Sequence, residues 1–243
     1  MILLYEQCMY RFSELLADDL KYCKYQLEIN RFPNGEFNFC RVNFNDNVLI
    51  IFPNSGDINF NLMKYIIFLK NIDCSKNVYI FMPYIPYSRQ NTSQAFQFVI
   101  SEMKTLNVKK IITIDIHKYD NDEFIINILP HELAGNKYNG IDVTVAPDIG
   151  AMNRARHFAN YLKTELVIID KVTLNVLNAD KIKNKNCLIV DDIKDTGKTI
   201  QLATDLLTQN EARNIKVCVS SDIRNNLEDY HIEIGQCFHD INP

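Results

Sequence analysis

The residues of this chain best suited to chemistry lie between Cys187 and Thr199. A short apolar run predicts a buried strand, and two adjacent carboxylates, Asp191 and Asp192, follow directly at its end. Carboxylates in that position can accept hydrogen bonds from the vicinal hydroxyls of a sugar. The pair taken alone is also compatible with an acidic turn that binds nothing.

The polar segment that follows opens a predicted helix. Backbone N–H groups at a helix N-terminus favour an anion such as phosphate, and Gly197 permits a close approach of the backbone. Threonine hydroxyls add donors, and Lys198 supplies charge or points to solvent. The candidate binding residues of this region are Asp191, Asp192, Asp195, Thr196, Gly197, Lys198 and Thr199. Their order predicts a site for a phosphorylated sugar.

Several other polar residues follow predicted strands. They include Asp115-Ile116-His117, Pro147-Asp148 and Asp170-Lys171. Ligands of doubly wound sheets bind beyond the carboxyl ends of the strands, so we expect these residues to line one edge.

The elements that must position these residues are short apolar runs alternating with helical stretches. The predicted strands are 48–52, 78–82, 111–115, 143–146, 166–170, 187–191 and 216–220. The predicted helices are 57–70, 94–107, 149–163 and 199–210. Continuous apolar runs suit strands buried on both faces, and the alternation predicts an α/β fold with parallel sheets.

The pattern repeats once, which predicts two similar halves. The polar segment 118–141 has weak periodicity and marks the boundary, so we predict domains at 1–138 and 139–243. The opening 47 residues are expected to be irregular, with a helix at 11–20 and a hairpin.

Composition excludes several classes of protein. The chain has 243 residues, 47% of them hydrophobic, and a net charge of -4, which argues against disorder and against a nucleic-acid partner. No apolar run approaches the roughly 20 residues of a membrane span. Seven scattered cysteines without a metal-binding spacing, and no signal peptide, predict a cytoplasmic protein.

Six segments in order carry a resemblance to a known family. They are Asn30–Glu36 (NRFPNGE), Pro83–Gln90 (PYIPYSRQ), Thr113–His117 (TIDIH), Ala146–Arg156 (APDIGAMNRAR), Ile168–Lys171 (IIDK) and Cys187–Thr199. The last resembles the phosphoribosyl-diphosphate-binding signature, and the others resemble segments of ribose-phosphate diphosphokinase. The chain is therefore identified as similar to that family, whose fold consists of two phosphoribosyltransferase-like halves, each a twisted, mainly parallel sheet with flanking helices.

The resemblance implies transfer of the diphosphoryl group of ATP to ribose 5-phosphate with Mg²⁺. It implies catalytic roles for Lys171 and His117, and magnesium binding by His117 and Asp148. The residues that it places on ATP are Phe32, Asn34, Glu36, Arg89 and Gln90. The segment around Phe32 completes the ATP site of a neighbouring subunit in the family, which implies a homo-oligomer, at least a dimer.

The chain departs from the family at several points. Thr173 stands where the family has its second catalytic residue, an arginine, and no arginine occurs between Lys171 and Asp191. Lys181, Lys183 and Lys185 are candidate substitutes. The basic loop after Arg89 is missing, and Ser221–Arg224 replaces the family's Thr-His segment. Two alternatives therefore stay open: a phosphoribosyltransferase that consumes the activated sugar, and a regulatory homologue with weakened catalysis.

Overall fold

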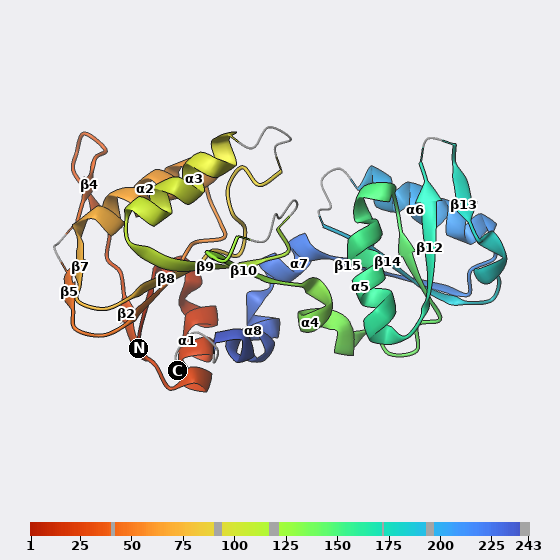
Figure 1. Cartoon of the computed structure of the whole chain (residues 1–243), viewed down its shortest axis with the longest axis horizontal. Coiled ribbons are helices and arrows are strands. Elements are labelled where there is room, and N and C mark those ends of the chain that lie inside the picture. The colour runs from red at the N-terminus through yellow and green to blue at the C-terminus, as the bar shows by residue number, and fades with distance from the viewer. Residues whose placement is uncertain (40–41, 90–93, 117–121, 172, 193–196, 239–243) are drawn as a thin grey trace. The chain divides into compact units, whose positions relative to one another are not determined.

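A computed structural model of the chain describes residues 1–39, 42–89, 94–116, 122–171, 173–192 and 197–238. The chain divides into two compact units. Unit 1 comprises residues 1–128 and 227–243, and unit 2 comprises residues 129–226. Each unit is built around its own sheet (Figure 1).

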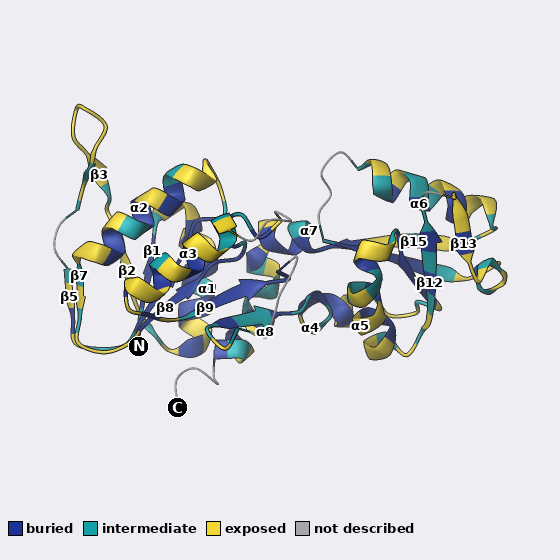
Figure 2. Ribbon diagram, turned by 45° about the horizontal axis from the view of Figure 1, so that its top comes forward, coloured by how far each residue is buried: buried dark blue, intermediate teal, exposed yellow. Residues whose placement is uncertain are grey.

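Unit 1 contains a six-stranded parallel sheet in the order β10-β9-β8-β6-β1-β2. Its strands are β1 (Ile2–Tyr5), β2 (Cys23–Gln26), β6 (Val48–Ile51), β8 (Val78–Phe81), β9 (Val108–Ile114) and β10 (Ile125–Ile128). The middle strands β6 and β8 are buried along their whole length, as Figure 2 shows for β8. This burial is what continuous apolar runs predict for a sheet covered on both faces.

Helices cover both faces of this sheet (Figure 1). They are α1 (Tyr10–Leu20), α2 (Ile58–Asn71), α3 (Gln94–Thr105) and α8 (His231–Phe238), with 3₁₀ turns η1 (Gln7–Met9) and η5 (Leu227–Tyr230). On one face, Phe12 and Phe238 contact Phe81 of β8, with ring centroids 5.5 and 5.8 Å apart. The other face belongs to α2 and α3, whose Tyr65 and Met103 enter the same apolar core.

Two small two-stranded sheets complete unit 1. The strands β3 (Asn30–Arg31) and β4 (Phe37–Asn38) form an antiparallel hairpin. The strands β5 (Val42–Phe44) and β7 (Ile72–Cys74) pair in parallel.

Unit 2 contains a five-stranded sheet in the order β13-β12-β11-β14-β15, in which only β13 is antiparallel. Its strands are β11 (Val143–Ala146), β12 (Glu165–Asp170), β13 (Asn175–Leu177), β14 (Asn186–Asp191) and β15 (Asn214–Val219). Its helices are α4 (Pro130–Ala134), α5 (Met152–Leu162), α6 (Lys198–Gln209) and α7 (Ser220–Asn225), with 3₁₀ turns η2 (Gly135–Lys137), η3 (Ile149–Ala151) and η4 (Ala179–Lys181).

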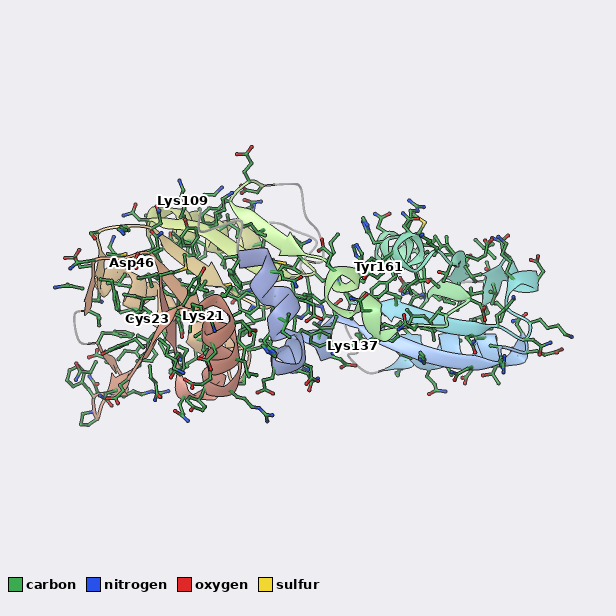
Figure 3. The ribbon with its side chains drawn as sticks, turned by 90° about the horizontal axis from the view of Figure 1, so that it is seen from below. Lys21, Cys23, Asp46, Lys109, Lys137 and Tyr161 are labelled. Carbon is green, nitrogen blue, oxygen red and sulfur yellow. The ribbon has the colours of Figure 1, made fainter. Side chains whose placement is uncertain are left out.

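Helix α5 is locked against the segment before the sheet by one close contact. A Cβ atom at Gly135 would lie 2.4 Å from Cε1 of Tyr161, so only glycine fits beside that ring (Tyr161 is labelled in Figure 3). The Tyr161 hydroxyl donates to Oδ1 of Asn136 at 2.6 Å. This contact fixes α5, which carries residues of the candidate site.

The two sheets share one topology. The order β2-β1-β6-β8 in unit 1 repeats as β12-β11-β14-β15 in unit 2, with α1 and α5 as the corresponding first crossover helices. The prediction of an α/β chain with two similar, mainly parallel halves is confirmed.

The division between the two units falls after Ile128, inside the segment 118–141 that we expected to mark the boundary. This segment contributes β10 to unit 1 and α4 to unit 2, and the residues from 227 onward, which include α8, belong to unit 1. The opening residues, expected to be irregular, form a β1-α1-β2 unit of the main sheet. The strands here have only four residues, and the edge strand Cys23–Gln26 is polar, so the apolar pattern that identifies a strand is too short to detect in the sequence.

Candidate active site

Three parallel strands of unit 2 end at the same edge of the sheet and place charged residues there. Asp148 follows β11, Asp191 ends β14, and Lys171 follows β12. The Lys171 ammonium donates to Oδ2 of Asp148 at 2.6 Å. This hydrogen bond raises the pKa of Lys171, and the negative charges of Asp148 and Asp191 raise it further. Lys171 is therefore a fixed positive charge at the edge, with half of its side chain exposed.

Asp148 is held by the backbone as well. Its Oδ1 accepts from the N–H of Ala151 at 3.1 Å and so caps the turn η3 before α5. One carboxylate thereby fixes both the start of α5 and the position of Lys171.

Asp191 is a buried carboxylate. Burial raises its pKa to about 6, and the charges of Asp192 and Asp148 add to that effect. A hydrogen bond of 2.9 Å from the N–H of Asp192 to Oδ1 of Asp191, and the charge of Arg154, act in the opposite direction. A buried acid with a strongly shifted pKa in such a position is typical of a functional site.

Asp192 is held from two sides. Its carbonyl oxygen accepts from the N–H of Ser221 at 2.9 Å and from Nη2 of Arg224 at 3.3 Å. Its Oδ2 lies 3.9 Å from Nη2 of Arg154, and both of these side chains are largely buried.

The helices α6 of unit 2 and α2 of unit 1 begin differently within the described residues. The N-cap residue of α6 is Gly197, which has φ 75° and no side chain with which to cap the helix. In the corresponding position of unit 1, Asp57 caps α2 and accepts from the N–H groups of Asn59 and Phe60 at 2.8 and 2.9 Å. A carboxylate already occupies the anion position of α2, whereas the N-cap residue of α6 brings no side chain there.

The remaining residues of this loop are partly described. Lys198 is exposed and Thr199 is half-buried, both in the first turn of α6. Asp195 and Thr196 lie outside the described residues.

The position of the missing arginine is part of a tight turn. The Thr173 hydroxyl donates to Oδ2 of Asp170 at 2.8 Å, and its N–H lies 3.4 Å from Oδ1 of the same carboxylate. The chain then reverses into β13, which runs back along β12. Thr173 therefore stabilises the turn and brings no positive charge.

The three lysines considered as substitutes lie at the wrong edge of the sheet. Lys181 pairs with Glu165 at 2.5 Å, at the start of β12. Lys183 pairs with Glu211 at 2.9 Å, and Lys185 lies next to the start of β14. A strand of this length spans roughly 16 Å. The suggestion that these lysines replace the arginine is therefore wrong.

In unit 1, three of the five residues predicted to bind ATP lie on the β3–β4 hairpin. The N–H of Phe32 donates to the carbonyl of Glu36, the N–H of Gly35 to that of Phe32, and the N–H of Glu36 to Oδ1 of Asn34, at 2.9, 2.8 and 3.2 Å. Phe32 is 48% exposed, so an apolar ring stands in solvent at the tip. A shallow pocket lined by Asn34, Gly35, Glu36, Phe37 and Ile67 lies beside it.

Aromatic contacts hold this hairpin on α2. The guanidinium carbon of Arg31 lies 4.2 Å from the centroid of the Phe60 ring, and Phe37 packs on the same ring with centroids 4.9 Å apart. Phe39 continues the contact to Phe68 at 5.8 Å. The hairpin is thus anchored at its base while its tip stays exposed.

The other predicted residues of unit 1 follow β8 and β9. Arg89 is exposed, and Gln90 lies outside the described residues. Asp115 is buried with φ 50°, and its N–H donates to the carbonyl of Ile128 at 3.0 Å. His117, two residues further on, is also outside the described residues.

The structure thus brings Asp148, Lys171, Asp191 and Asp192 together in unit 2, and Phe32, Asn34 and Glu36 together in unit 1. Arg224 was not found as a site residue from the sequence. The one available signal was an arginine beside the apolar residues of β15 and α7, where a buried cation needs an acidic or carbonyl partner.

Comparison with known proteins agrees with this geometry. Residues 115–238 match the model of the phosphoribosyl transferase domain, and residues 1–109 match the N-terminal domain of ribose phosphate pyrophosphokinase. The chain is 27% identical to ribose-phosphate pyrophosphokinase of Bacillus caldolyticus, over 87% of this chain and 73% of that protein. It is 32% identical to the enzyme of Mycoplasma pneumoniae, over 78% and 65% of the two chains.

A solved structure supports the fold. Phosphoribosylpyrophosphate synthetase of Mycobacterium smegmatis superposes with a TM-score of 0.72 at 23% identity, over 89% of this chain and 79% of that one. Fold and strand-edge site together define a protein of the phosphoribosyltransferase class. Within that class, the chain belongs to the ribose-phosphate pyrophosphokinase family, as the two matched domains show.

No helix in the described ranges has the length and apolar character needed to cross a membrane. The six cysteines within those ranges are all free thiols.

Proposed function

We propose that this chain is a ribose-phosphate pyrophosphokinase that converts ATP and ribose 5-phosphate into AMP and 5-phosphoribosyl 1-diphosphate. The observation that carries the proposal is the charged edge of unit 2, where the acidic pair Asp191–Asp192 and the ion pair of Lys171 with Asp148 lie at the carboxyl ends of parallel strands, and where α6 begins with Gly197. Family membership gives independent support.

The sugar phosphate is bound by the loop between β14 and α6. Backbone N–H groups at the start of α6 donate to the 5-phosphate, with Gly197 allowing close approach and Lys198 and Thr199 adjacent. Asp191 and Asp192 accept hydrogen bonds from the ribose hydroxyls. We extend this role to Asp195 and Thr196 of the same loop.

The reaction joins the 1-oxygen of ribose 5-phosphate to the β-phosphorus of ATP. The bond between the β-phosphorus and the oxygen bridging to the α-phosphorus breaks, AMP leaves, and the hydroxyl proton is released. Such transfer depends on positioning and on neutralising charge more than on covalent catalysis. Lys171 supplies positive charge on the transferred group, and we assign the companion role to His117.

The residues present fit a divalent cation bound mainly through substrate. Within the described ranges, no cluster of three or more metal-binding side chains occurs. Mg²⁺ commonly takes one or two carboxylates and completes its shell with water and substrate phosphates, so the Asp148 carboxylate, at the strand edge and 20% exposed, suits it. His117 is the second proposed ligand. When bound, the ion neutralises the charge of the ATP phosphates.

ATP is assigned to the hairpin and to Arg89 and Gln90. The exposed Phe32 ring offers an apolar face to a base, and the hairpin tip presents Asn34 and Glu36. An apolar ring standing in solvent is also suited to reach a neighbouring chain, and we propose a homo-oligomer of at least two subunits in the cytoplasm.

Subunit complementation tests this arrangement. Phe32→Ala and Lys171→Ala each lower activity when alone, because each removes one part of every site. Mixed oligomers of the two variants contain some sites with an intact hairpin from one chain and an intact lysine from the other. We therefore expect recovery of part of the wild-type activity after the purified variants are unfolded and refolded together.

The control is a chain that carries both substitutions, which is unfolded and refolded in the same way. We expect no recovery of activity in this sample. If mixing the single variants also gives no recovery while sedimentation shows oligomers, the hairpin serves its own chain.

The proposed function is tested by ³¹P NMR with ATP, ribose 5-phosphate and magnesium. Growth of AMP together with a sugar-linked diphosphate establishes diphosphoryl transfer. Unchanged spectra, with ribose 5-phosphate still bound, would overturn the synthase assignment.

One observation favours a second candidate function. The turn at Thr173 and the position of Lys181, Lys183 and Lys185 leave the 171–185 segment with a single cation, Lys171, at the active edge. A chain of this kind that bound sugar phosphate but turned over slowly would act as a regulatory partner of a full synthase. Unchanged ³¹P spectra together with co-purification with a synthase would select it.

A further inference from the structure

We propose that Arg154 is a positioning residue that sets the carboxylate of Asp192 for recognition of the ribose. The proposal deepens the proposed function and rests on it. It concerns a side chain outside the strand-end and loop residues to which the sequence motifs assigned roles in binding or catalysis.

The backbone of Asp192 is already anchored. The Ser221 N–H and the Arg224 guanidinium, both from α7, donate to its carbonyl oxygen at 2.9 and 3.3 Å. Arg224 is buried, so this anchor is part of the interior of unit 2. With the backbone fixed, the freedom left to Asp192 lies in its side-chain torsions.

Arg154 acts on that remaining freedom. Its Nη2 lies 3.9 Å from Oδ2 of Asp192, and the two side chains are 10% and 14% exposed. Ion pairs shielded from water are screened less than surface pairs, so this charge favours one direction of the carboxylate.

The placement of Arg154 is fixed by its helix. Asp148 caps the turn that leads into α5, and Arg154 follows in the first turn of that helix, between Asn153 and the buried Ala155. Arg156 lies two residues further on the same helix and is exposed. The two arginines therefore differ in burial and in their contact with Asp192, which makes Arg156 a matched control.

The two acids of the pair lie in different surroundings. Asp191 is buried, whereas Asp192 is half-buried with the Arg154 guanidinium 3.9 Å from its Oδ2. The charge of Arg154 also acts on Asp191, where it opposes the rise in pKa that burial causes. Two adjacent carboxylates in different surroundings suit recognition of two neighbouring hydroxyls that approach from different directions.

Calorimetric titration of the full chain with ribose 5-phosphate tests the proposal. We expect Arg154→Gln to weaken binding ~10- to 100-fold, the range for loss of an interaction with a charged group. Arg154→Lys keeps the charge on a shorter head of different shape and should weaken binding ~3- to 10-fold. Arg156→Gln should bind as the wild type does, and the affinity of all variants for ATP should be unchanged.

A double-mutant cycle separates positioning from a general structural role. If Arg154 acts through Asp192, Arg154→Gln adds little to the loss already caused by Asp192→Asn. The proposal would be overturned if the loss of affinity in the double variant equalled the product of the two single losses. It would also be overturned if Arg154→Gln bound ribose 5-phosphate with wild-type affinity. Should Arg154→Gln fail to fold, Arg154→Lys carries the test, and wild-type affinity in that variant has the same meaning.

The result for the wild-type chain distinguishes failure of the proposed function from failure of the role of Arg154. If the wild type does not bind ribose 5-phosphate, the proposed function itself fails. If the wild type binds and Arg154→Gln binds equally well, only the role of Arg154 is refuted.

Discussion

Replacing Lys171 by alanine is expected to lower the rate of diphosphoryl transfer ~10²- to 10³-fold or more while leaving the binding of ribose 5-phosphate nearly unchanged. The reason lies in the edge described for unit 2. Lys171 is the one lysine of the 171–185 segment at the carboxyl ends of the strands, and its 2.6 Å hydrogen bond to Asp148 keeps its head there. The proposed site of the sugar, by contrast, is the loop after β14.

The measurement is single-turnover ³¹P kinetics with saturating substrates, together with calorimetric binding of ribose 5-phosphate. Lys181→Ala is the matched control, because Lys181 forms a similar pair with Glu165 at the opposite edge of the same sheet. We expect full activity in that variant. Equal losses of activity in Lys171→Ala and Lys181→Ala would mean that the substitutions act by destabilising the fold and not by removing a charge from the site.

The expected loss bears on the missing arginine. If Lys171 carries the transition-state charge without a partner on its own loop, its removal leaves two arginines that are already engaged and Lys198 at the start of α6. Arg154 lies near Asp192, and Arg224 is bound to a backbone carbonyl. The chain therefore depends on Lys171 more heavily than a synthase with a second cation on the loop.

Much of this site was readable from the sequence because parallel strands have a simple signature. Continuous apolar runs such as 187–190 mark strands buried on both faces, and polar residues at their ends must meet at one edge. Asp148, Lys171, Asp191 and Asp192 were found in this way, and the structure places them together.

The rest depended on tertiary structure that has no local signature. Nothing in the sequence near Lys181 shows that β13 runs antiparallel and carries the chain away from the active edge. The return of α8 to unit 1 follows from contacts such as that between Phe238 and Phe81, which are distant in sequence. Arg224 became part of the site through α7, an element too short to be predicted from periodicity.

The strand β1 was missed for a related reason. Its four residues, Ile2–Tyr5, are no longer than many buried loop segments, and its partner β2 is exposed along its length. Only the pairing of β1 with both β2 and β6 shows that it belongs to the sheet.

Replacing Asp191 by asparagine is expected to stabilise the protein at pH 7.5 by about 1–3 kcal/mol and to weaken ribose 5-phosphate binding ~10- to 100-fold. Burial raises the pKa of Asp191 to about 6, so the folded chain holds a proton that the unfolded chain releases near pH 4. The contribution of this group to stability is therefore full below pH 4 and is lost as the pH rises to about 6. Above that pH the folded chain holds a buried negative charge beside Asp192.

Asparagine removes the charge and keeps an oxygen that can accept from the N–H of Asp192, as Oδ1 of Asp191 does at 2.9 Å. Urea unfolding at pH 5 and pH 7.5 measures the effect as the difference between wild type and variant, which should grow with pH. Asp180→Asn, at an exposed position of unit 2, is the control and should leave both stability and binding unchanged. A variant at position 191 that is less stable than the wild type at pH 7.5 would contradict the argument. A gain in stability with a loss of binding would mean that the chain keeps a destabilising carboxylate for its ligand, a common relation at functional sites.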